Sequence, residues 1–146
     1  MKPQFVIDHI EKLRKLLDLK DLDIFVRSFN SRKDAEVLTT ANIVALSTAQ
    51  VAALSTSQVA ALTTGQVQAI ATDDVKALTT SAVAALSTTQ VQALSTAAVN
   101  ALTTSQVTSL TTSQVSSLTT GEVAALNTSQ VAALTTGQVQ ALTVSQ

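Results

Sequence analysis

An eight-residue repeat fills most of the chain and limits its possible folds more than any other feature. The unit reads L-[S/T]-T-x-Q-V-x-A, and thirteen copies run from Leu38 to Ala141, followed by a fragment from Leu142 to Gln146. Leu or Ile opens every unit, and Val or Ile follows five residues later. Eight residues of α-helix turn through about 800°, so an unbroken helix would rotate this apolar pattern by about 80° per unit. A continuous helix is therefore excluded, and the strict alternation of a strand is also absent.

Each unit instead has the pattern of a short helix that restarts at its own N-cap. The Ser47 hydroxyl can accept from the backbone N–H of Gln50, whose side chain can accept from the backbone N–H of Ser47, which makes a capping box. Leu46 and Val51 then occupy the two positions of a hydrophobic staple, which explains their spacing of five. Twelve of the thirteen cap positions hold Ser, Thr or Asn, with Ala71 as the exception. We therefore expect one two-turn helix in each unit.

The fifth position of the unit holds the partner of the capping box. It is Gln in eight of the thirteen units, with Asn42, Asp74 and Glu122 as near equivalents, whereas Ala82 and Ala98 lose the box. The third position is Thr in all thirteen units. This Thr is either the true cap, with the helix shifted by one residue, or a residue that bonds a neighbouring unit. A third interpretation is a regular Thr array that binds ice or another lattice.

Helices of two turns are marginally stable alone, because nucleation is costly, so they must stack on their neighbours. Repeats that bury their apolar faces on each other form a solenoid. The sequence therefore predicts an all-α solenoid with one helix per repeat. A β-solenoid is the alternative, since the repeat is short and rich in Thr. Ala and Gln at fixed positions, together with the capping box, favour the helix.

The chain divides by charge into a head, residues 1–37, and the octad array, residues 38–146. The head holds fifteen of the nineteen charged residues, and the array holds only Asp73, Asp74, Lys76 and Glu122. Apolar residues in the head follow at helical spacing from Val6 to Leu17. We expect an amphipathic helical cap whose last residues, 30–37, form a degenerate first unit. The alternative is a helix that dimerises or lies on a membrane surface.

No residue pattern points to catalysis, a cofactor or a metal. There is no cysteine, and His9 is the only histidine, so a ligand set cannot be assembled from these residue types. Asp73 and Asp74 fall in the first turn of their unit, where anions complement the helix dipole. One Lys and no Arg across the array argue against nucleic-acid binding, because phosphate contacts need cations. We therefore expect a protein that is not an enzyme, binds no nucleic acid and has no transmembrane segment.

Two resemblances bear on the array. Residues 38–146 resemble the Leu-Thr-Thr-x-Gln-Val-x-Ala octad arrays of large bacterial surface proteins that are often described as adhesins. The run from Leu62 to Thr72 resembles the opening of the repeat in transcription-activator-like effectors, although the period here is eight and the base-reading loop is absent. The first resemblance implies a bacterial surface protein. The second reflects shared helix capping and does not imply DNA recognition.

These observations predict a non-catalytic structural protein that self-assembles, with a protein- or peptide-binding solenoid as the alternative. The near-neutral surface of the array has little charge to keep copies apart. We expect head-to-tail contacts that form oligomers or fibres, with Leu142 and Val144 as the assembly contact and the head of the next copy as the partner. The N-terminus lacks the apolar region of a secretory signal. A surface or extracellular location would then need a leaderless route, and a cytoplasmic location is the alternative.

Overall fold

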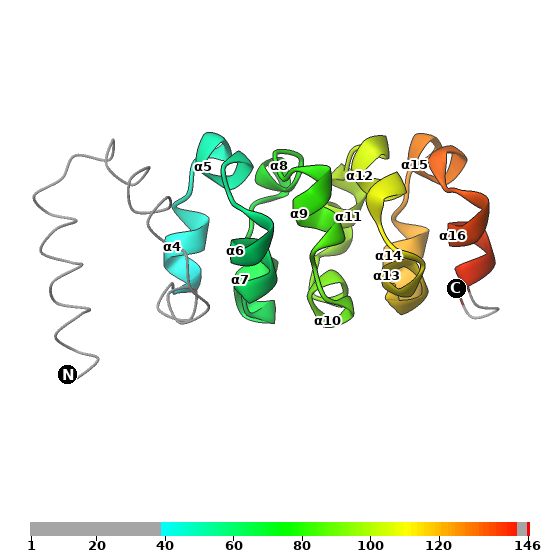
Figure 1. Cartoon of the computed structure of the whole chain (residues 1–146), viewed down its shortest axis with the longest axis horizontal. Helices are drawn as coiled ribbons and strands as arrows, with labels where there is room; N and C mark the ends of the chain where they lie inside the picture. Colours follow the sequence, from blue (N-terminus) through cyan, green and yellow to red (C-terminus); the bar gives the residue numbers. More distant parts are fainter. Residues whose placement is uncertain (1–38, 143–145) are drawn as a thin grey trace, which may run out of the picture.

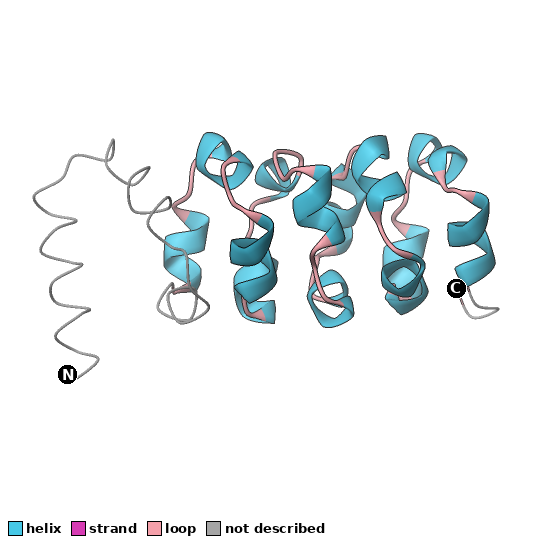
Figure 2. Ribbon diagram, in the orientation of Figure 1, coloured by secondary structure: helices cyan, strands magenta, loops and turns pink. Residues whose placement is uncertain are grey.

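The computed structural model describes residues 39–142 and 146, and this part of the chain is all-α. It holds thirteen helices of four to six residues and no strand, so the predicted all-α solenoid is confirmed and the alternative β-solenoid is wrong (Figure 2). The helices are shorter than the two full turns expected. The predicted head, residues 1–37, lies outside the described residues.

The helices follow one another at the period of the repeat. They are α4 (Thr40–Val44), α5 (Thr48–Ala52), α6 (Thr56–Ala61), α7 (Thr64–Gln68), α8 (Thr72–Val75), α9 (Thr80–Ala84), α10 (Thr88–Gln92), α11 (Thr96–Ala101), α12 (Thr104–Ser109), α13 (Thr112–Ser117), α14 (Thr120–Ala124), α15 (Thr128–Ala133) and α16 (Thr136–Ala141).

The second position of the unit is the N-cap, and the invariant Thr is the first helical residue. In α12, the Thr103 hydroxyl accepts from the backbone N–H of Gln106 at 3.1 Å, and the Gln106 Oε1 accepts from the backbone N–H of Thr103 at 2.7 Å. The full capping box is present in ten helices, namely α4, α5, α6, α7, α10, α12, α13, α14, α15 and α16. The predicted cap position is therefore confirmed.

Three helices depart from the box as their sequences require. Thr79 and Ser95 still cap α9 and α11 through their hydroxyl groups, but Ala82 and Ala98 have no side chain to reach back. In α8, Ala71 provides no side-chain cap, and the expectation that Asp74 would act as a box partner is wrong. Without a hydroxyl at residue 71, the reciprocal pair cannot form, and the Asp74 carboxylate bonds a residue of α5 instead.

Helices three apart in the chain pack against each other. The pairs include α9 with α12, α12 with α15, α10 with α13, and α13 with α16. Three eight-residue units therefore complete one turn of the solenoid before the next turn stacks on it. Figure 1 shows the helices succeeding one another along the long axis of the molecule, from α4 in cyan to α16 in red.

The core of the solenoid is a stack of the first- and sixth-position side chains. Val107 is 0% exposed and Leu110 is buried beside it, as the octad pattern predicts, and their equivalents are buried from Ile43 to Leu118. Residues at the seventh position, which varies from unit to unit, are exposed, for example Gln92, Thr108 and Gln140. The chain thus buries a narrow apolar interior and keeps its variable positions outside.

The invariant Thr has a role in packing between turns. A Cβ built at Gly65 would lie 3.9 Å from the Thr40 Cγ2, and one built at Gly137 would lie 3.7 Å from the Thr112 Cγ2. A side chain at the fourth position of these units would therefore be in ordinary van der Waals contact with the Thr methyl group of the unit one turn earlier. Thr supplies a methyl group for the next turn that Ser would lack.

Candidate assembly surface

The last turn of the described solenoid, α14 to α16, exposes apolar side chains that every earlier turn buries. Val131 is 51% exposed and Val139 is 53% exposed, whereas the equivalent Val115 is buried. Helix α13 is covered by α16, but no described helix follows to cover α15 and α16. This pattern shows that the sixth-position side chain points toward the following turn. We call the face formed by Val131, Val139 and the half-buried Leu134 and Leu142 the terminal face.

Of the two residues predicted to mediate assembly, the structure places Leu142 at the terminal face. Leu142 is half-buried, packs against the core and forms the C-cap of α16. Val144 lies outside the described residues. The larger apolar exposure comes from Val131 and Val139, which the sequence analysis did not single out. The octad pattern alone does not identify these two valines, because their exposure depends on the number of units in one turn of the solenoid.

The second feature of the stack is a buried amide that joins successive turns. Gln106 is 2% exposed, and its Nε2 donates to the backbone carbonyls of Val75 at 2.8 Å and Leu78 at 2.7 Å. These carbonyls belong to the C-terminal end of α8 and the residues that follow it, one turn earlier in the solenoid. The same side chain uses its Oε1 in its own capping box. One glutamine therefore caps the start of its own helix and satisfies the end of another.

The arrangement repeats along the described array, and we call it the glutamine ladder. In each case the amide donates to a Leu carbonyl 28 residues earlier and a Val carbonyl 31 residues earlier. Its members are Gln90, Gln106, Gln114, Gln130 and Gln138. The octad pattern predicts only a capping-box role for these residues and does not predict their burial. The preference for Gln over Glu was an available signal, because either side chain can complete a box but only Gln also carries a donor.

Gln146 extends the ladder by one unit. Its Nε2 donates to the carbonyls of Val115 and Ser116, each at 3.3 Å, and to the carbonyl of Leu118. Gln146 is the fifth residue of the fragment that begins at Leu142. The fragment therefore places its amide on α13 in the register of a complete unit.

Glu122 interrupts the ladder. It is 2% exposed, and its Oε2 accepts from the backbone N–H of Thr119 at 2.6 Å and from the Thr119 hydroxyl at 2.8 Å. Its Oε1 is buried without a hydrogen-bond partner. By the 28- and 31-residue spacing of the ladder, the groups opposite this oxygen are the carbonyls of Leu94 and Val91. A carbonyl group can only accept a hydrogen bond. A carboxylate can complete the capping box here, but it cannot supply the donor that the earlier turn needs.

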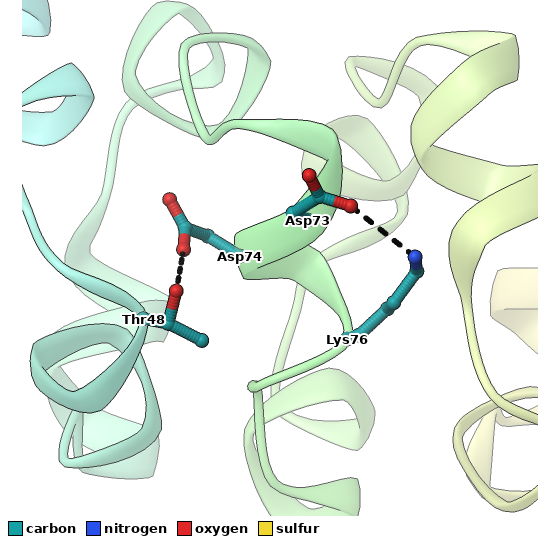
Figure 3. A network of polar contacts seen from close by, with 4 residues as sticks. All are labelled: Thr48, Asp73, Asp74 and Lys76. Carbon is teal, nitrogen blue, oxygen red and sulfur yellow. Dashed lines mark hydrogen bonds and ion pairs between the residues drawn. The ribbon is translucent and has the colours of Figure 1, made fainter.

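The charged residues in and next to α8 make two separate polar contacts (Figure 3). The Thr48 hydroxyl donates to the Asp74 Oδ1 at 2.7 Å, and the Lys76 Nζ lies 3.3 Å from the Asp73 Oδ1. The Lys76–Asp73 pair is largely exposed, so solvent screens it. Within residues 39–142 and 146, no three carboxylate, histidine or cysteine groups come together as a metal site would require. The two aspartates thus serve helix ends and a contact between turns, and His9 lies outside the described residues.

None of the helices described here is both long and apolar enough to span a bilayer.

Comparison with known proteins identifies the repeat. A family model for the ALTTAQ repeat matches residues 34–64, 67–104, 91–120 and 117–144. No curated protein and no solved structure matches the chain. The resemblances to bacterial surface arrays and to transcription-activator-like effectors therefore remain predictions. Because the matched segments cover most of the chain, it belongs to the ALTTAQ repeat family.

Proposed function

We propose that this chain is a non-catalytic structural repeat protein that self-associates through the terminal face. The observation that carries the proposal is the exposure of Val131 and Val139, whose equivalents in earlier turns of the solenoid are buried. Fully burying a valine contributes roughly 1.5 kcal/mol or more, so covering both would favour association appreciably. The contact would repeat the packing that already joins one turn of the solenoid to the next.

The charge distribution supports the proposal. The only charged side chains among the described residues are Asp73, Asp74, Lys76 and Glu122, and none lies in α15 or α16. The terminal face therefore presents no row of like charge to a second copy of the chain. An end-to-end contact that does not close into a ring adds copies without limit and gives a filament. This geometry supports the proposed structural role in extended assemblies.

A bacterial surface is the location that the octad resemblance implies, and we include it in the proposal. Accessibility of the native protein to protease on intact cells tests it. Digestion of the protein on intact cells, with a cytoplasmic marker left whole, supports the surface location. Protection until the cells are lysed contradicts it and favours the cytoplasmic alternative.

The self-association is tested by charging the terminal face. The double variant Val131→Lys with Val139→Glu places a charge of each sign at the two exposed valines while keeping the net charge. Its matched control is Ala132→Lys with Gln140→Glu, which places the same charges on the same two helices at exposed positions outside the face. Sedimentation velocity over a concentration series reports the oligomeric state of each protein.

The proposal predicts that the wild type and the control variant form species larger than a monomer as concentration rises. The terminal-face variant should remain monomeric, with unchanged helicity by circular dichroism. A wild type that is monomeric at every concentration, or a terminal-face variant that assembles like the wild type, contradicts the proposal.

A further inference from the structure

Glu122 places a buried carboxylate oxygen where the glutamine ladder has an amide nitrogen. Its Oε2 accepts from the backbone N–H of Thr119 at 2.6 Å, just as the Gln106 Oε1 accepts from its own N-cap at 2.7 Å. Both side chains are 2% exposed. A carboxylate and a carboxamide have the same planar shape, so the Glu122 Oε1 occupies the position that Nε2 takes in Gln106.

The groups opposite this oxygen are backbone carbonyls at the end of a helix one turn earlier. In the ladder, Nε2 lies between 2.6 Å and 3.0 Å from the carbonyl oxygens 28 and 31 residues earlier. In four members, a third carbonyl, 30 residues earlier, lies between 3.1 Å and 3.5 Å away. For Glu122, these spacings select the C-terminal end of α10 and the residues directly after it. We call the Glu122 Oε1 and the carbonyl oxygens of Val91, Gln92 and Leu94 the oxygen cluster.

The carbonyl groups of the oxygen cluster are suited to a cation. They belong to the C-terminal end of a helix, which carries partial negative charge. The Val91 carbonyl accepts from the backbone N–H of Leu94 at 3.0 Å, and a carbonyl oxygen has a second lone pair that can bind another group. In the ladder an amide N–H fills this role, whereas the Glu122 Oε1 adds a further acceptor.

The Glu122 carboxylate has no cationic side chain beside it. Across residues 39–142 and 146, Lys76 is the only Lys or Arg, and its Nζ lies 3.3 Å from the Asp73 Oδ1. The Glu122 Oε1 is buried without a hydrogen-bond partner. Buried charges in proteins are paired with an opposite charge or coordinate a metal ion. A cation from solution would supply the compensation that the described part of the chain does not.

We propose that the oxygen cluster binds one dehydrated monovalent cation, Na⁺ or K⁺. Backbone carbonyl oxygens can replace the hydration shell of such an ion, and one carboxylate balances its charge. Ca²⁺ takes about six to eight oxygen ligands and Mg²⁺ keeps several waters, which a cluster closed to solvent does not provide. The site draws most of its ligands from the backbone, unlike a metal site built from several carboxylate, histidine or cysteine groups. It is independent of the proposed self-association.

The bound cation would join two turns of the solenoid, so its binding should stabilise the folded chain. A ligand that binds only the folded state raises stability as its concentration increases. Glu122→Gln is the matched control, because it keeps the capping box and replaces Oε1 with an NH2 group that donates to the same carbonyls. This variant completes the ladder and needs no cation.

Urea unfolding in NaCl, KCl and tetramethylammonium chloride at equal ionic strength tests the site, because the last cation is too large to enter the cluster. The wild-type midpoint should be higher in NaCl or KCl than in tetramethylammonium chloride, and the salt with the larger shift identifies the ion. Glu122→Gln should have the same midpoint in all three salts, so its advantage over the wild type is widest in tetramethylammonium chloride. A wild type with equal midpoints, or a variant that shifts as the wild type does, would overturn the inference. Stabilisation of the wild type by millimolar CaCl2 alone would overturn the choice of a monovalent ion.

Moving the carboxylate to another turn tests the ligand set. Gln114 is 2% exposed, completes its own capping box and donates to the carbonyls of Val83, Ala84 and Leu86. Adding Gln114→Glu to the Glu122→Gln chain should restore the dependence on Na⁺ or K⁺. If Na⁺ is the preferred ion, sodium-23 NMR of the folded proteins should show a broader signal with the wild type than with Glu122→Gln. A folded double variant without cation dependence contradicts the assigned ligands.

Discussion

At the residue scale, a single buried glutamine side chain both caps its own helix and donates hydrogen bonds to two carbonyls of another turn. Gln106 accepts from its own N-cap through Oε1, and its Nε2 donates to the carbonyls of Val75, the last residue of α8, and of Leu78, three residues later. The last carbonyls of any helix lack partners within that helix, and so short a helix has a large share of them. Glutamine suits this position because it offers an acceptor and a donor on one planar group. Glutamate at the same position can satisfy only part of this requirement, because an ionised carboxylate carries no donor.

Glu122 provides the sharpest test at this scale. Replacing it with Gln changes one oxygen to an NH2 group, which can donate to the carbonyls of Val91 and Leu94. We expect Glu122→Gln to raise the free energy of unfolding by about 1–3 kcal/mol, because a buried polar atom without a partner gains one. Urea unfolding at neutral pH measures the change.

The reverse substitution is the control for Glu122. Gln106→Glu should lower the free energy of unfolding by a similar amount, because it removes a ladder donor in the same structural position. Equal stability of both variants and the wild type would show that the ladder hydrogen bonds do not contribute to folding.

At the element scale, each helix depends on its cap and on its neighbours. With only four to six residues, the helices have few internal hydrogen bonds to offset the cost of nucleation. The capping pattern, the N-cap residue and the staple could all be predicted from the octad, because they depend on residues within one unit. The burial of the fifth position could not be predicted in that way, since its partners lie 28 and 31 residues earlier.

The capping box predicts coupling between Thr103 and Gln106. Thr103→Ala should cost about 0.5–2 kcal/mol, the usual range for loss of an N-cap side chain. Gln106→Ala should cost more than Thr103→Ala, because it also leaves the carbonyls of Val75 and Leu78 without their donor. The double variant should cost less than the sum of the singles, since the pair shares its bonds. Strict additivity in urea melts would contradict the reciprocal box.

The stacking of turns predicts different costs for the same substitution at equivalent positions. Val107→Ala removes two methyl groups from a fully buried site and should cost roughly 1–3 kcal/mol. Val139→Ala changes the same octad position on the terminal face and should cost much less in the monomer. Unfolding measured at low protein concentration compares the two. Equal costs would show that the last turn is covered like the others.

At the scale of the whole molecule, the solenoid consists of thirteen copies of one octad unit. The octad predicts a helical solenoid, and the structure adds that three units complete a turn. The backbone becomes extended at the opening Leu of several units, as at Leu110 with φ −61° and ψ 136°. Such a bend sets the angle between helices through small backbone rotations, which residue types alone do not determine. The exposure of Val131 and Val139 depends on this geometry, so the octad alone does not predict it.

The measurement that tests this description most directly is the hydrogen exchange of glutamine side-chain amides, followed by NMR. The structure predicts slow exchange at Gln106, whose Nε2 is buried between two carbonyls, and fast exchange at Gln140, whose side chain is exposed. Equal and fast exchange at Gln106 and Gln140 would contradict the glutamine ladder.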